Sequence, residues 1–155
     1  SFQAELLFSK NRWNITAAYK NYDIKLMYKD GLKQKPLQPR EILFFNFGTE
    51  SRKVDEKLWK YDFTFNSLGK QRLMKNVRDK NKYSSSHFTI NSQVTRVFSE
   101  KFEIYVGGEN LNNYMQPEPI IFASDPFNKD FDASIIHGPI FGASYYAGLR
   151  YKILN

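Results

Sequence analysis

Hydrophobic and polar residues alternate with a period of two along several stretches of the chain. In the clearest stretch, residues 59–66, aromatic residues alternate with polar ones: Trp59, Tyr61, Phe63 and Phe65 against Lys60, Asp62, Thr64 and Asn66. Successive side chains of a β-strand point to opposite faces of a sheet, whereas the apolar stripe of a helix recurs every three to four residues. The stretch therefore predicts a strand with one apolar and one polar face.

The same alternation predicts six further strands, at residues 2–8, 13–20, 41–49, 87–95, 102–107 and 144–153. Past Asn21 the parity of the apolar positions shifts by one, because Tyr22, Ile24, Leu26 and Tyr28 are now the apolar ones. We expect a β-bulge at Lys20–Asn21, since no glycine or proline is present for the alternative, a tight turn. No segment has a helical pattern, so the sequence predicts an all-β protein with about seven strands.

Short and long polar connections alternate between the predicted strands. Brief connections follow Phe8, Thr49 and Phe98, and extended ones follow Tyr28, Asn66 and Asn113. Residues 29–40 contain Asp30-Gly31, Pro36 and Pro39 and are predicted to be a loop. This alternation is typical of an outer-membrane barrel, which has short turns on its periplasmic side and longer loops outside.

The last predicted strand fits two architectures. Its apolar positions are Tyr145, Ala147, Leu149, Tyr151 and Ile153, and its other face carries Arg150 and Lys152. A soluble sandwich would pack the apolar face against a core, whereas a membrane barrel would turn it toward lipid and leave the cations in a wet lumen. The alternation alone leaves both open.

Composition narrows the class of protein. The 155 residues have a mean hydropathy of −0.58 and no apolar run of 18 residues, which excludes a transmembrane helix but not membrane strands. Aromatic residues reach 17%, as the aromatic girdles of a barrel require. The net charge of +7 points to nucleic acid or an anionic surface as partner, and the lack of cysteine excludes thiolate chemistry. Ser1 opens directly into an alternating run, so we expect the chain to be part of a longer polypeptide.

Several motifs in the second half of the chain resemble the end of a TonB-dependent outer-membrane receptor. They are Gly107 to Tyr114 (GGENLNNY), Pro119-Ile120-Ile121, Asp125-Pro126-Phe127, Phe131 to Ser134 (FDAS), Gly138 to Gly142 (GPIFG) and the closing Tyr146 to Tyr151 (YAGLRY). Similar runs in the family match Lys35-Pro36-Leu37, Pro39-Arg40 and Gly69 to Leu73. The resemblance thus covers essentially the whole chain.

The resemblance implies a transmembrane antiparallel β-barrel of 22 strands, of which residues 1–155 would be about the last seven. Implied partners are the rest of the barrel and its plug, outer-membrane lipid and lipopolysaccharide, and the TonB complex reached through an N-terminal part outside this chain. The implied location is the outer membrane of a Gram-negative bacterium, and the implied function is uptake of a scarce solute such as a metal chelate, a peptide or a glycan. Two alternatives are a non-transporting barrel component of an outer-membrane complex and a soluble basic β-domain that binds nucleic acid.

In a barrel, strand residues of one parity would face lipid and those of the other parity would face the lumen. Positions expected to face lipid are Trp13, Ile15, Trp59, Tyr61, Phe63, Phe65, Leu149, Tyr151 and Ile153. In the near-continuous apolar run 41–49, the parity of Leu43, Phe45 and Phe47 is expected to join them. Positions expected to face the lumen, where they would contact the plug or line a path, are Lys60, Asp62, Thr64, Asn66, Thr89, Asn91 and Gln93, with Thr95 continuing the row.

Candidate ligand contacts are confined to three groups of residues. His87 and His137 lack further metal ligands at a fixed spacing, so ordinary loop or lumen histidines are expected. Asp125, Asp130 and Asp132 lack the spacing of a calcium loop, which favours turn-stabilising roles. Residues 69–86 contain a basic run that could bind phosphate or carboxylate groups or could be a solvated loop. The run has no interleaved aromatic residues, which counts against binding of single-stranded nucleic acid. Its members are Lys70, Arg72, Lys75, Arg78, Lys80 and Lys82.

We predict neither enzymatic activity nor a cofactor. The run Ser84-Ser85-Ser86-His87 has no nucleophile elbow and no recognisable acidic partner.

Overall fold

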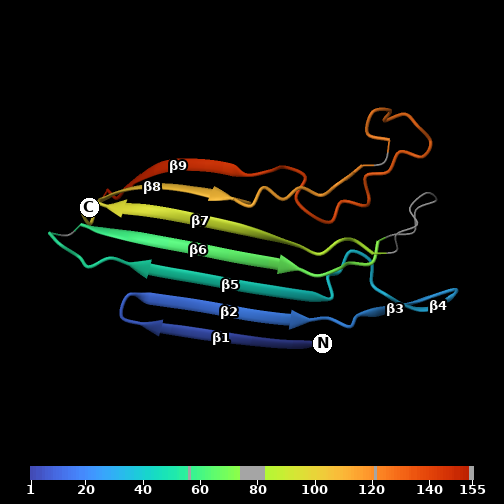
Figure 1. The fold of residues 1–155 in the computed structure, drawn as a ribbon, viewed down its shortest axis with the longest axis horizontal. Coiled ribbons are helices and arrows are strands. Elements are labelled where there is room, and N and C mark those ends of the chain that lie inside the picture. Colours follow the sequence, from blue (N-terminus) through green and yellow to red (C-terminus); the bar gives the residue numbers. More distant parts are fainter. Residues whose placement is uncertain (56, 74–82, 121, 154–155) are drawn as a thin grey trace.

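A seven-stranded antiparallel sheet forms the body of the protein in the computed structural model, which describes residues 1–55, 57–73, 83–120 and 122–153 (Figure 1). The strands are β1 (Phe2–Lys10), β2 (Trp13–Asn21), β5 (Glu41–Glu50), β6 (Leu58–Leu68), β7 (His87–Val97), β8 (Phe102–Glu109) and β9 (Ser144–Tyr151). They lie side by side in this order, so each long strand pairs with its neighbours along the chain. The predicted all-β architecture and the seven strands are confirmed. The sheet is open, with β1 and β9 as its two edges.

A small hairpin lies outside this sheet and corrects one prediction. β3 (Lys25–Tyr28) pairs only with β4 (Gly31–Gln34), and the two form a separate sheet. β2 ends at Asn21, and the Tyr22 amide donates a hydrogen bond to the carbonyl of Arg40, 2.8 Å away. The predicted bulge at Lys20–Asn21 and the alternative tight turn there are both wrong, because the parity shift marks a second sheet. The prediction of loop throughout residues 29–40 is wrong where β4 forms.

The six connections between the strands of the large sheet are segregated by length. Residues 11–12, 51–57 and 98–101 connect strands at one end, which we call the short-turn end. Residues 22–40, 69–86 and 110–143 connect strands at the other end, the long-loop end, at the right of Figure 1. The predicted alternation of short turns and long loops is confirmed.

The register of the sheet sorts its side chains onto two faces. Phe45 pairs with Phe65 and Phe47 with Phe63 across β5 and β6, and the Trp13 ring lies 5.3 Å from that of Phe47. The strand residues predicted to face lipid, with Leu43, Phe45 and Phe47, share this side, which we call the apolar face: Trp13, Ile15, Trp59, Tyr61, Phe63, Phe65, Leu149 and Tyr151. Ile153 lies beyond β9 and is 85% exposed.

The opposite side, the polar face, collects every position predicted to face a lumen: Lys60, Asp62, Thr64, Asn66, Thr89, Asn91, Gln93 and Thr95. Whether lipid or water covers either face stays a prediction.

The large sheet leaves its apolar face uncovered, whereas a water-soluble sheet would pack that face against a core. On β6 the two faces are similarly exposed, since Tyr61 and Asp62 are both exposed and Phe63 and Thr64 are both half-buried. On β7 the polar-face residues His87 and Thr95 are only 7% and 6% exposed, whereas Phe88 on the apolar face is 45% exposed. Leu149 of β9 is 68% exposed. Among the described residues, the buried hydrophobic side chains are Leu73 and Ile135, and both lie in long loops. The same residues include no helix long and apolar enough to cross a membrane.

Candidate functional site: the polar face and the loop cluster

The centre of the polar face is a network of amide, hydroxyl and carboxylate groups. Asn46 Nδ2 donates to Thr64 Oγ1 at 2.9 Å and approaches both carboxylate oxygens of Asp62 at 3.3 Å. Gly48 of β5 lies between Asn14 and Asp62 and leaves a shallow hollow beside the carboxylate. The face therefore offers hydrogen-bond donors and acceptors held by neighbouring strands.

Two tyrosine–glycine pairs lock β8 to β9 on the same face. In the register, Tyr105 opposes Gly148 and Gly107 opposes Tyr146. A Cβ at Gly107 would lie 2.5 Å from the ring of Tyr146, and one at Gly148 would lie 2.4 Å from the Tyr105 hydroxyl. The glycines are therefore required by the rings that lie over them. The Tyr146 hydroxyl reaches across to Gln93 Oε1 on β7, 3.1 Å away.

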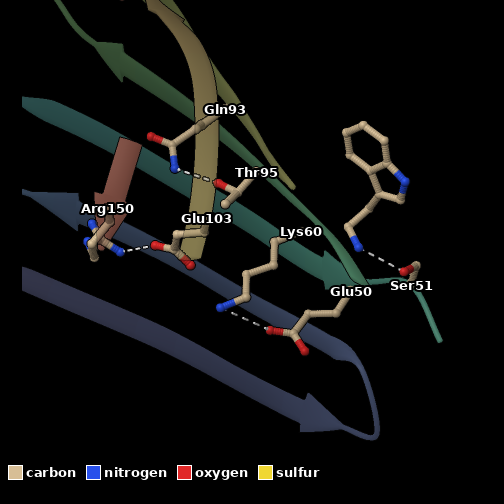
Figure 2. Close-up of polar contacts among 8 residues, drawn as sticks. Glu50, Ser51, Lys60, Gln93, Thr95, Glu103 and Arg150 are labelled. Carbon is tan, nitrogen blue, oxygen red and sulfur yellow. Dashed lines mark hydrogen bonds and ion pairs between the residues drawn. The ribbon is translucent and has the colours of Figure 1, made fainter. Parts of the chain in front are cut away.

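Toward the short-turn end the polar face becomes charged (Figure 2). Arg150 of β9 pairs with Glu103 of β8, and Lys60 Nζ of β6 lies 4.0 Å from Glu50 Oε1 of β5. Between them Gln93 Nε2 donates to Thr95 Oγ1 at 3.1 Å. Each ion pair joins two neighbouring strands of the sheet.

At the long-loop end, buried and half-buried polar side chains from two long loops and β7 form a group that we call the loop cluster: Gln71, Ser84, His87, Tyr114, Gln116 and His137. Gln116 Oε1 accepts from the backbone amides of His137 and Gly138, at 2.7 and 2.9 Å. Gln71 Nε2 donates to the His137 carbonyl at 3.1 Å, which ties the loop 69–86 to the loop 110–143. Buried polar groups that are satisfied in this way rigidify the segments that carry them.

His87 and Tyr114 stack within the loop cluster. Their ring centroids are 4.7 Å apart and their planes differ by 3°. Gly138 lies beside the imidazole, where a Cβ would come within 3.2 Å of His87 Cε1. His87 Nδ1 and the Tyr114 hydroxyl are buried and have no hydrogen-bond partner in the part of the chain that the structure describes. Burial raises the pKa of Tyr114. His137 Nδ1 lies 2.9 Å from the Ile135 carbonyl oxygen, within hydrogen-bond distance.

Asparagines close the base of the longest loop and account for the conspicuous GGENLNNY motif. Asn110, at a φ of 52°, donates through Nδ2 to the carbonyls of Tyr114 and Phe141, at 2.7 and 3.1 Å. Asn113 Oδ1 accepts from the Ala143 amide at 2.9 Å. The two side chains join the start of the loop 110–143 to its end.

The acidic candidates lie in turns of that loop. Asp132 Oδ1 accepts from the Ser134 amide at 2.7 Å, the geometry of an Asx turn, and hydrogen bonds from Ser134 lower the pKa of Asp132. Asp125 Oδ2 accepts from Asn128 Nδ2 at 3.3 Å, and Asp130 lies in the next turn. Within the described residues, no group of three histidine, aspartate or glutamate side chains could hold a metal ion.

The basic candidates differ in whether they contact other parts of the chain. Arg72 Nη1 donates to the Gln34 carbonyl at 2.7 Å and its guanidinium lies 4.9 Å from the centre of the Tyr28 ring, so Arg72 anchors the β3–β4 hairpin. Lys70 is exposed. Lys75, Arg78, Lys80 and Lys82 lie outside the described residues.

Sequence reasoning did not single out Gln71, Tyr114 or Gln116, although these residues organise the loops. Their partners are far away in the chain: Gln71 bonds His137 and Tyr114 stacks on His87. The cluster of asparagines at positions 110, 112 and 113 was the available signal, because asparagine adopts positive φ and bonds to nearby backbone more readily than most residues.

Comparison of the chain with protein-family models, curated proteins and solved structures gave no match.

Proposed function

We propose that this chain is the C-terminal part of the barrel wall of a TonB-dependent outer-membrane receptor that takes up a scarce solute. The observation that carries the proposal is the uncovered apolar face of the sheet. Apolar side chains are exposed along one face from β1 to β9, and the opposite face carries a hydrogen-bonded polar network. This distribution suits hydrocarbon outside and water inside.

The connections and the edges support the same proposal. Short turns at one end and long, internally bonded loops at the other match the periplasmic and external sides of an outer-membrane barrel. The open edges β1 and β9 would leave backbone groups unsatisfied in lipid, at a cost of several kcal/mol each. Further strands that pair with both edges would complete the barrel, and in the family they precede this part of the chain.

The long loops and the large sheet would have different roles in the receptor. The external loops would contact solute and lipopolysaccharide, the polar face would line the lumen against a plug, and the wall would remain rigid while TonB-coupled energy displaces the plug. None of these roles requires covalent chemistry. A nucleic-acid role is disfavoured by the polar face, on which the strands carry more carboxylates than cations: Glu5, Glu50, Asp62, Glu103 and Glu109 against Lys20, Lys60 and Arg150.

Fractionation of cells that express the full-length protein tests the proposal. The expected result is a protein that stays with outer membranes after an alkaline carbonate wash and is released only by detergent. Recovery in the soluble fraction would contradict it. Energy-dependent solute uptake that fails when the TonB complex is deleted would separate a transporter from a structural barrel component of the same membrane.

A further inference from the structure

A depression at the short-turn end of the polar face gathers cations from separate parts of the chain. It is lined by Lys60 of β6 and Arg150 of β9, and by Lys53, Lys101 and Lys152, which lie in the two adjacent turns and just after β9. We call this site the basic depression. The rest of the polar face is rich in carboxylates, so the cations here are a local reversal of its charge.

Two of these five cations lie beside carboxylates, and the other three form no ion pair with a described residue. Arg150 pairs with Glu103, and Lys60 lies near Glu50 (Figure 2). Within the described residues, Lys53, Lys101 and Lys152 form no ion pair. Glu100 and Glu103 are the only carboxylates in the described lining. With Glu50, which lies beside Lys60 but outside the lining, five cations face three carboxylates. The excess of positive charge would be neutralised by a ligand with several negative groups.

The walls of the depression are not wholly polar. Leu58 and Val97, paired across β6 and β7, contribute half-buried apolar side chains beside the cations. An inorganic anion would make no use of them. A membrane phospholipid is disfavoured because its chains would lie against the apolar face, whereas Lys60 and Arg150 project from the polar one.

We propose that the basic depression binds an acidic polypeptide segment that carries several carboxylates and at least one apolar side chain. The carboxylates pair with Lys53, Lys101 and Lys152, and the apolar side chain packs on Leu58 and Val97. The site lies at the end of the sheet opposite the loop cluster, so this inference goes beyond the proposed solute uptake. It rests on the proposed contact of the apolar face with lipid, but on neither the solute nor the TonB complex.

Binding of a fluorescein-labelled peptide of glutamate and leucine to the full-length protein in nanodiscs tests the proposal by fluorescence anisotropy. The double variant Lys101→Glu, Lys152→Glu is expected to weaken binding about tenfold or more, and added salt should weaken wild-type binding as well. A matched control is Lys10→Glu, Arg12→Glu, which makes the same change in charge at the same end of the sheet but outside the depression. The control should bind within about twofold of wild type.

Three results would overturn the proposal. They are an equal loss in the control pair, no loss in the depression pair, or competition by inorganic phosphate at concentrations as low as those of the peptide, which would indicate a small-anion site. Should the charge reversal prevent folding, Lys101→Gln, Lys152→Gln removes the same charges with less repulsion and is expected to show the same direction of change. Equal binding of a peptide of glutamate alone would contradict the apolar contact with Leu58 and Val97.

Discussion

Most of the buried side chains of the described residues lie at the long-loop end, whereas the large sheet contributes chiefly Thr95 from its middle strands. The loop cluster resembles the interior of an ordinary protein in one respect, because its groups are shielded from solvent and largely paired with one another. The sheet leaves its aromatic rows half-buried or exposed. The loops are therefore stabilised by their own contacts, whereas no described part of the chain covers the apolar face of the sheet. In the proposed barrel, lipid would cover that face.

The largest expected effect comes from placing a charge on each face of β6 in turn. Phe63→Lys puts an ammonium on the apolar face and is expected to block assembly, since a lysine at the bilayer midplane costs about 2–4 kcal/mol. Thr64→Lys, one residue along on the polar face, should be tolerated. Membrane recovery and heat-modifiable electrophoretic mobility measure both, and equal tolerance at the two positions would show that the faces are misassigned.

In the loops, the largest effect is expected at Asn110. Asn110→Ala removes the hydrogen bonds to Tyr114 and Phe141. It also places an alanine, which cannot make these bonds, at a φ of 52°, so the loop is expected to lose about 2–3 kcal/mol of stability. Hydrogen exchange should accelerate across residues 110–143 and remain unchanged in β5 and β6. Asn110→Gly relieves the backbone strain but does not restore the lost hydrogen bonds, so it should recover only part of the lost stability. Acceleration throughout the sheet would mean that loops and sheet are one cooperative unit.

A smaller effect within the sheet is expected at the tyrosine–glycine pairs. Gly107→Ala must displace the Tyr146 ring and with it the bond to Gln93, a loss of about 1 kcal/mol in the free energy of unfolding. Gly48→Ala is the matched control on the same face, because the nearest atoms would lie 3.8 Å from its Cβ. Urea unfolding in detergent compares them, and an equal loss would show that the rings do not need the space.

The smallest expected effect is a pH dependence at Asp132. Its pKa lies below the usual 3.8 because of hydrogen bonds from Ser134, so the stabilisation is complete above pH 3.8 and is lost as the pH falls through the lowered value. Asp132→Asn keeps the accepting oxygen and should remove this dependence. The amide resonance of Ser134, followed by NMR below pH 4, would show it, and a shift that persists in the variant would assign the effect to another group.

The strands of the large sheet could be predicted from sequence because their signal is local. Alternation along β6 and β9 fixes both the strand and its two faces, and polar runs mark the connections. In β5 the run from Ile42 to Phe47 is nearly all apolar, so alternation alone does not identify its apolar face. Leu43 was assigned to that face because Asn46 and Gly48 lie on the other one, and the register agrees.

What escaped prediction depends on contacts between distant residues. The alternation changes parity between β2 and the β3–β4 hairpin, but a parity change alone does not distinguish a bulge within one strand from the start of a second sheet. Hydrogen bonds such as that from Tyr22 to Arg40 separate the two sheets. The stacking of His87 on Tyr114 and the bonds of Gln116 to His137 and Gly138 join positions more than 20 residues apart. No local pattern reports such a contact.

Spin labels on β6 test most directly whether the apolar face contacts hydrocarbon. The chain has no cysteine, so Phe63→Cys and Thr64→Cys each provide a single labelling site in the full-length protein in lipid bilayers. The account predicts that the label at position 63 is relaxed by oxygen dissolved in the bilayer and shielded from a water-soluble nickel complex, with the opposite result at position 64. Shielding of the label at position 63 from both reagents would place the aromatic rows in a packed protein core and contradict the account.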